Sequence, residues 1–88
     1  MYRVRLAKRA ERSLSRIRQG NPRGYERIKV AIQSLAENPR PPGAIKLTAF
    51  QPPAWRLRVG EYRIVYEVLS DELVVLVVNV ASRGEIYK

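Results

Sequence analysis

The hydrophobic period of this sequence changes from that of helices to that of strands at a proline-rich segment near the middle of the chain. Before the prolines, apolar residues recur mainly every three or four positions, which is the period of helices with one buried face. After them, apolar and polar residues alternate, which is the period of strands with one buried face. Helices followed by a run of strands predict an α+β fold, in which the helices pack on an antiparallel sheet.

Turn and capping signals divide the first half into three elements. Residues 2–6 alternate apolar and charged side chains, which predicts a short strand. Two helices follow, because Gly20 ends the first, Asn21 is suited to cap the second and Pro22 to open it. Asn38-Pro39 ends the second helix. The two helices form a hairpin whose apolar stripes are Ala7, Ala10, Leu14, Ile17, Tyr25, Ile28, Ile32 and Leu35.

The second half begins with a stiff connector over residues 38–43, which is rich in proline. Alternation then predicts strands over residues 55–59 and 62–68, joined by a turn at Gly60-Glu61. A turn at Ser70-Asp71 leads into residues 72–80, whose apolar side chains on both faces place them inside the sheet. The predicted order is β-α-α-β-β-β, a small, mostly antiparallel sheet with a helical hairpin packed on one face.

The charge of the chain constrains its partners. Its 88 residues, 45% of them hydrophobic, are expected to form one domain over residues 1–88. There are 17 Lys and Arg against 8 Asp and Glu, for a net charge of +9. This excess favours nucleic acid or an acidic protein as partner, the alternative being a solvated basic surface without a ligand. It is concentrated early in the chain, at Arg3, Arg5, Lys8, Arg9, Arg12, Arg16, Arg18, Arg23, Arg27 and Lys29.

The amino-acid composition argues against several classes of chemistry. The chain has no cysteine and no histidine, so it offers neither disulfides nor thiolate chemistry nor the usual zinc ligands. Residues 1–6 do not have the pattern of a signal peptide, and the longest apolar run, residues 73–78, is too short to span a bilayer. We therefore expect a cytoplasmic protein that uses no metal and no cofactor and has no membrane partner.

Three arginines of the predicted hairpin are candidates for anion binding. If the apolar side chains of these strands cover the helices, alternation directs Arg56, Arg58 and Arg63 to the opposite face. Like charges on neighbouring strands repel, so this grouping favours a bound anion. The alternative is an open solvated face on which Glu61 and Glu67 compensate the charge. The side chains expected to face the helices are Trp55, Leu57, Val59, Tyr62, Ile64 and Tyr66.

The same hairpin resembles a known family. Residues 55–67, WRLRVGEYRIVYE, are similar to the RelE/ParE toxin superfamily pattern of a basic-apolar-basic strand, a Gly-acid turn and Tyr-Arg-x-x-Tyr. The upstream LAENP at residues 35–39, the pair Lys46-Leu47 and the ending SRGEIY at residues 82–87 also fit this pattern. The resemblance covers essentially the whole chain and implies a RelE-like fold.

The resemblance implies a toxin of a type II toxin–antitoxin system. RelE-like members are ribosome-associated endoribonucleases, which cleave messenger RNA without metal by attack of the 2′-hydroxyl on the adjacent phosphate. In that scheme Arg63 clamps the phosphate, Arg83 stabilises or protonates the leaving oxygen, and Tyr87 stacks on a base or steers the 2′-hydroxyl. The expected RNA- or phosphate-binding residues are Lys46, Arg56 and Arg58. The general base is left open: it is Lys46, Tyr87 or Glu85, or the reaction depends on positioning by the ribosome.

Partners and alternatives also follow from the resemblance. The expected partners are a cognate acidic antitoxin, in a toxin–antitoxin hetero-oligomer, together with the ribosome and messenger RNA. The basic residues of the two predicted helices form either a solvated surface or a surface that docks on ribosomal RNA. One alternative is a ParE-like toxin that inhibits DNA gyrase without catalysis, and another is an inactive basic nucleic-acid-binding module. The basic cluster and the terminal tyrosine favour the RelE-like function.

Overall fold

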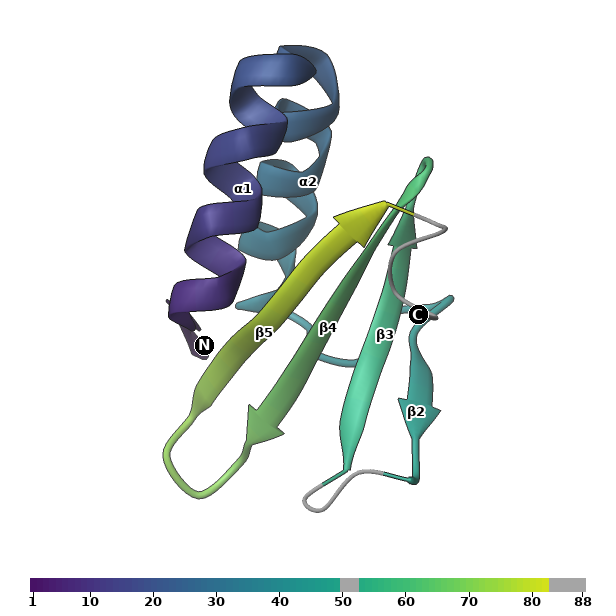
Figure 1. The fold of residues 1–88 in the computed structure, drawn as a ribbon. Helices are drawn as coiled ribbons and strands as arrows, with labels where there is room; N and C mark the ends of the chain where they lie inside the picture. Colours follow the sequence, from purple (N-terminus) through teal and green to yellow (C-terminus); the bar gives the residue numbers. More distant parts are fainter. Residues whose placement is uncertain (50–52, 83–88) are drawn as a thin grey trace.

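The computed structural model describes residues 1–49 and 53–82, and within them it confirms the predicted α+β fold (Figure 1). The order of its elements differs from the prediction by one added strand, β2 (Ile45–Leu47). Since β2 has three residues and follows the proline-rich connector, it carries no alternating pattern long enough to predict it. The elements are β1 (Arg3–Leu6), α1 (Lys8–Gly20), α2 (Pro22–Leu35), β2 (Ile45–Leu47), β3 (Ala54–Val59), β4 (Tyr62–Leu69) and β5 (Val74–Ser82).

The strands described form one mixed sheet in the order β1-β5-β4-β3-β2. β2, β3, β4 and β5 pair antiparallel along the sheet, whereas β1 pairs parallel with β5. The apolar strand β5 therefore lies inside the sheet, as predicted. β1 accompanies only the first half of β5, from Val74 to Val77. Beyond that point α1 contacts β5, so the second half of this strand borders a helix.

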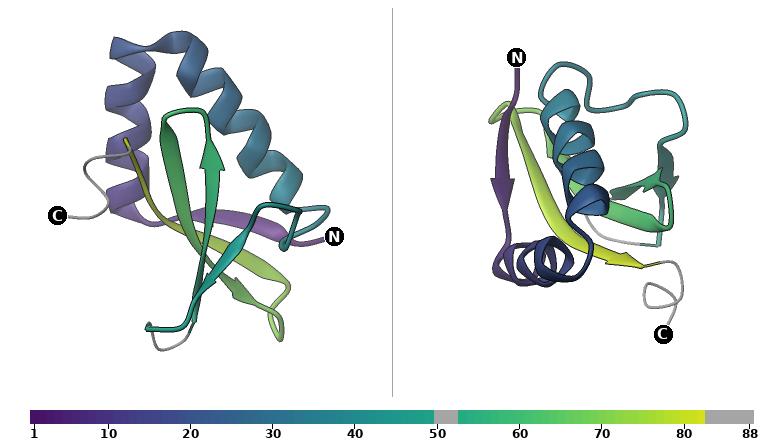
Figure 2. Two further views of the ribbon diagram at one scale, coloured as in Figure 1. Left: turned by 90° about the vertical axis from the view of Figure 1, so that its right-hand side faces the viewer. Right: turned by 90° about the horizontal axis from the view of Figure 1, so that it is seen from above.

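The helical hairpin forms as its capping residues predict (Figure 2). Pro22 occupies the first turn of α2, and the side chain of Asn21 accepts a hydrogen bond from the backbone N–H of Gly24 at 3.1 Å. The Asn21 Nδ2 also donates to the Tyr62 hydroxyl at 3.0 Å. One residue therefore caps α2 and connects the top of the hairpin to β4.

The core lies between the hairpin and one face of the sheet. Trp55, Leu57, Val59 and Tyr62 pack against this core from their half-buried positions, which confirms the predicted inward face of β3 and β4. Within the described part of the chain, no helix is long and apolar enough to cross a membrane. The largest fully buried side chains are Ile28, Leu35, Ile64, Tyr66, Val75, Val77 and Val80.

Candidate functional site

A tight turn builds the candidate site by bringing two arginine-bearing strands together. Val59 pairs with Tyr62, so only Gly60 and Glu61 connect β3 to β4. Gly60 has φ +60°, a backbone conformation that residues with a side chain adopt at a cost. A Cβ at this position would also lie 3.3 Å from Nη1 of Arg27 on α2. A glycine at this position therefore allows the two-residue turn that keeps β3 and β4 in this pairing register.

The register confirms the predicted placement of three arginines on the face turned away from the core. Arg58 is directly opposite Arg63, and Arg56 is opposite Val65 two positions along. Because directly paired residues share a face, with Cβ atoms about 5 Å apart, the Arg58 and Arg63 side chains start side by side. We call Arg56, Arg58 and Arg63 the arginine face. It stands on two paired strands in the interior of the molecule's only described sheet, not on a loop.

The members of the arginine face differ in exposure. Arg58 is exposed, and its Nε donates to the carbonyl oxygen of Gly60 at 3.3 Å. Arg63 is half-buried, and its Nη1 is buried. The guanidinium of Arg63 is therefore held in a restricted position in the sheet, whereas the guanidinium of Arg58 is presented to solvent. A phosphate reaching this face would meet the fork-shaped donors that suit its oxygens.

Among residues 1–49 and 53–82, the carboxylates on β4 and its turn lie at the edges of the arginine face. The two cross-strand neighbours of Arg63 are Arg58 on β3 and Ala81 on β5, neither of which is acidic. Glu67 lies at the other end of β4, diagonal to Arg56. Glu67 can therefore offset positive charge at the Arg56 end of the arginine face. At the Arg58–Arg63 pair, like charges are directly opposed across the two strands, and a bound anion would offset their repulsion.

The structure does not bring Lys46 to this face. Lys46 pairs with Trp55, whose side chain packs against the core, and cross-strand partners project from the same face. Lys46 is thus exposed at the edge of the sheet, on the side away from Arg56. Pairing with β3 sets the face of Lys46, and its expected role in binding RNA or phosphate stays a prediction. Arg83 and Tyr87 lie outside the described residues, as does Glu85.

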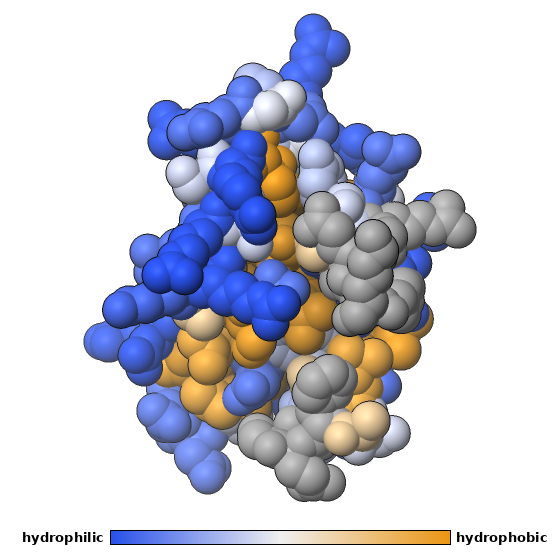
Figure 3. All heavy atoms as spheres, viewed as in Figure 1, coloured by the Kyte–Doolittle hydropathy of each residue, from blue (hydrophilic) through white to orange (hydrophobic). Residues whose placement is uncertain are grey.

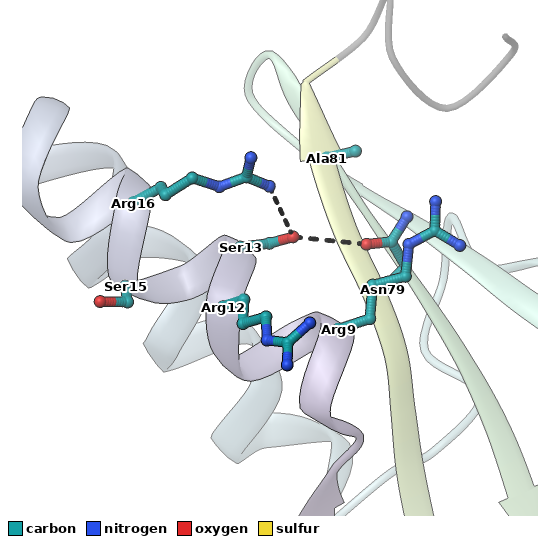
Figure 4. Close-up of a pocket in the computed structure, with 7 residues that line it drawn as sticks. All are labelled: Arg9, Arg12, Ser13, Ser15, Arg16, Asn79 and Ala81. Carbon is teal, nitrogen blue, oxygen red and sulfur yellow. Dashed lines mark hydrogen bonds between the residues drawn. The ribbon is translucent and has the colours of Figure 1, made fainter.

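A basic groove lies next to the arginine face and contains helix arginines that the sequence predicts either to be solvated or to dock on ribosomal RNA. It runs between α1 and the second half of β5, with a volume of about 480 Å³ (Figure 4). Ser13 of α1 donates to Oδ1 of Asn79 on β5 at 3.5 Å and accepts from Nη2 of Arg16 at 3.3 Å. A signal in the sequence was the recurrence of arginine at positions 9, 12 and 16 of a predicted helix, whereas Asn79 gave none.

The core behind β4 holds a buried tyrosine with a perturbed pKa. The Tyr66 hydroxyl donates to the carbonyl oxygen of Pro39 at 2.7 Å, which ties the connector to the sheet. Burial raises the pKa of Tyr66 to about 12, against the opposing effect of the Arg40 charge. The Arg40 guanidinium in turn lies 5.6 Å from the centre of the Trp55 ring. Residues 1–49 and 53–82 contain no cluster of three or more potential metal ligands.

The hairpin-on-sheet fold and the arginine face define a class, the small basic α+β toxins that the sequence resemblance indicated. The family model described as ParE toxin of type II toxin-antitoxin system, parDE, matches residues 4–87. The putative toxin RelE1 of Methanocaldococcus jannaschii is 28% identical over 80 residues, which are 89% of this chain and 89% of that protein.

Solved structures agree with this assignment. A chain of the archaeal RelE–RelB complex from Pyrococcus horikoshii matches with a TM-score of 0.77 at 28% identity, covering 96% of this chain and 97% of that one. A metal-bound toxin from Helicobacter pylori matches with a TM-score of 0.82 at 17% identity, over 98% and 99% of the two chains, which shows the shared fold alone. The chain belongs to the ParE toxin family, within the RelE/ParE superfamily, and is a toxin of a type II toxin–antitoxin system.

Proposed function

We propose that this toxin is an endoribonuclease that cleaves messenger RNA on the ribosome, by attack of a 2′-hydroxyl on the adjacent phosphate. The observation that carries the proposal is the direct opposition of Arg58 and Arg63 on the open face of the sheet, with Arg56 beside them. Such a pair of guanidinium groups stabilises the dianionic phosphorus centre that forms between them in the transition state. The relatives with RelE in their names support the same function.

The arginine face supplies charge stabilisation in this reaction. The 2′-oxygen attacks phosphorus and loses its proton to a base, while the bond from phosphorus to the 5′-oxygen breaks and that oxygen gains a proton. The products are a 2′,3′-cyclic phosphate and a free 5′-hydroxyl. Arg63, held partly inside the sheet, clamps the non-bridging oxygens through its planar fork. Arg58, which is exposed, and Arg56, which is half-buried, stabilise the added negative charge of the transition state.

The tail supplies the remaining roles in the proposal. Arg83 stabilises or protonates the leaving 5′-oxygen, and Tyr87 stacks on a base or steers the 2′-hydroxyl. Because the register directs Lys46 to the other side of the sheet, we place the general base on the tail, at Glu85 or Tyr87. Ser82 ends β5 next to Tyr62, so the tail starts on the strand adjacent to Arg63.

A cognate acidic antitoxin is part of the same proposal. Chains matching this one come from RelE–RelB or RelBE complexes of Pyrococcus horikoshii, Mycobacterium tuberculosis and Escherichia coli. A net charge of +9 attracts an acidic segment, and a small domain gains stability when its surface is covered. We expect a toxin–antitoxin hetero-oligomer that forms at both low and high salt, and an absence of complex at both would contradict this expectation.

Cleavage in a reconstituted translation system tests the nuclease proposal. The full-length toxin is added to ribosomes stalled on a defined message, and new 5′ ends are mapped by primer extension. Arg63→Ala is expected to lower the cleavage rate by about 10²–10³, the usual effect of losing a donor that acts on the transition state. Arg23→Ala, at an exposed arginine on α2, is the control and should cleave as the wild type does. Intact messages together with inhibited DNA supercoiling by gyrase would refute the proposal.

A further inference from the structure

The groove between α1 and β5 is built differently from an ordinary solvated helix surface. Its floor contains Ser13 and Ala81, each only 5% exposed, and the half-buried Asn79. Arg16 donates a hydrogen bond to Ser13 within α1, and Ser13 donates one to Asn79 on β5. Figure 4 shows both hydrogen bonds at the centre of the groove. The polar groups of the floor are therefore arranged before any ligand arrives, which reduces the entropy lost on binding.

Positive charge is concentrated along the helical wall of the groove. Arg9, Arg12 and Arg16 line it and are exposed. With 3.6 residues per turn they fall within about 60° of one another, whereas Glu11 points at least about 100° away from each. Figure 3 shows hydrophilic side chains gathered over α1 on this side of the molecule. Like charges at such spacing destabilise an isolated helix, so the stripe favours binding of an anion.

The groove is continuous with the arginine face. Ala81, in the floor of the groove, is the cross-strand partner of Arg63. Moving across the sheet from α1, a ligand would pass the groove, then Ala81 on β5, then Arg63 on β4 and Arg58 on β3. Arg9 and Arg16 are separated by about 10 Å along the helix axis, a length over which a nucleic-acid strand carries more than one phosphate.

We propose that this groove binds the sugar-phosphate backbone of single-stranded RNA, on the nucleotides next to the phosphate held by the arginine face. Arg9, Arg12 and Arg16 contact successive phosphates, and Asn79 offers its amide to the sugar or the base. The groove thus holds the substrate strand in line with Arg63. The identity of the strand as substrate rests on the proposed nuclease function, whereas the binding itself does not require cleavage.

An acidic protein segment is the competing ligand for the same charge. Protein partners gain most of their affinity from apolar anchors buried in pockets, and among the lining residues of this groove only Ala81 is apolar. A second groove, of about 200 Å³, lies between β1 and the helices and is lined by Val4, Leu6, Leu14, Tyr25 and Ile32, with Lys29 and Gln33. The surface beside β1 is lined mainly by apolar side chains, whereas the lining of the α1–β5 groove is mainly arginine and other polar side chains. The chemistry of the α1–β5 groove therefore favours RNA.

Binding of RNA that cannot be cleaved tests this proposal separately from the nuclease function. Fluorescence anisotropy measures the affinity of the full chain for a labelled 2′-O-methyl oligonucleotide, which lacks the attacking hydroxyl. The double variant Arg12→Gln/Arg16→Gln is compared with Arg23→Gln/Lys29→Gln, which removes the same charge from exposed positions on α2. The groove variant is expected to bind at least roughly tenfold more weakly than the control variant. Its plot of log affinity against log salt should be shallower by about 1.4, for two lost phosphate contacts.

Each alternative result is informative. Equal losses in the two variants would overturn the proposal, because they would show that only the overall field attracts RNA. Unchanged RNA binding with weakened binding of poly-L-glutamate would overturn it in favour of an acidic protein. If wild-type protein cleaves no message but the groove variant loses 2′-O-methyl RNA binding selectively, the groove proposal stands and the nuclease proposal fails.

A second measurement covers the case in which the groove variant does not fold. Wild-type protein is photocrosslinked to the same oligonucleotide carrying 4-thiouridine, and the attached peptides are identified by mass spectrometry. Crosslinks are expected within residues 9–16 or at residues 79–81. Crosslinks confined to other parts of the chain would overturn the proposal.

Discussion

Replacing Tyr66 with phenylalanine removes a single buried hydroxyl and changes how stability depends on pH. Tyr66 is 0% exposed, and its hydroxyl donates to the Pro39 carbonyl oxygen at 2.7 Å. Since Pro39 is buried too, its carbonyl would be left without this donor in the variant. Leaving a buried polar group unsatisfied costs about 1–3 kcal/mol. For a domain of this size, each kcal/mol lowers Tm by roughly 4–8 °C.

The alkaline range provides a sharper test of the same contact. Folding raises the pKa of Tyr66 from 10.0 to about 12, so the folded protein favours the protonated hydroxyl. Its contribution is complete below pH 10 and is lost as pH rises through 12. A rise of this size corresponds to about 3 kcal/mol, similar to the loss expected at neutral pH. The wild type should therefore lose its advantage over Tyr66→Phe between pH 10 and 12.

Urea denaturation followed by circular dichroism measures both effects. Free energies of unfolding are determined at pH 8 and at intervals from pH 10 to 12 for the wild type and Tyr66→Phe. Tyr2→Phe, which removes a hydroxyl at a half-buried position outside this contact, is the matched control. A difference between wild type and Tyr66→Phe that stays constant from pH 8 to 12 would show that the hydroxyl does not titrate as reasoned. Equal stability at pH 8 would show that the hydrogen bond does not stabilise the fold.

Three further substitutions test the site and its supports. Arg58→Ala removes repulsion with Arg63, so the thermal unfolding temperature of the variant should be unchanged or higher than that of the wild type. Its rate of message cleavage should fall by at least about tenfold. A large loss of stability would contradict the reasoning about repulsion. Gly60→Val puts a branched side chain at φ +60° and should lower the unfolding free energy in urea by about 1–3 kcal/mol. Asn21→Ala removes the cap of α2 and the donor to Tyr62, and should cost about 1–2 kcal/mol. Asn21→Asp keeps the cap and should recover part of that loss.

Local patterns in the sequence predicted most of the fold. Gly20, Asn21 and Pro22 marked the hairpin because capping and helix-opening preferences act over a few neighbouring residues. The apolar faces of β5 indicated an interior strand because only burial on both sides suits such a segment. β2 was missed because three residues show no period, and its pairing with β3 alone makes it a strand.

The candidate site was predictable only in part. The common face of Arg56, Arg58 and Arg63 follows from alternation in two strands joined by a tight turn, so it is a local property. The face of Lys46 is not local, because it depends on which residue of β3 pairs with it. The role of Lys46 therefore stays a prediction, as do the roles of Arg83 and Tyr87.

Apart from β2, the sequence by itself determined the elements, the buried face of each and the charge of the surface, because these depend on side chains a few positions apart. Only the tertiary structure decided which elements are neighbours. β1 pairs with the first half of β5 alone, so α1 borders the second half and its arginines meet Asn79 and Ala81 beside Arg63. Contacts between residues 60 or more positions apart arise from packing the whole chain around one core, and no local period encodes them.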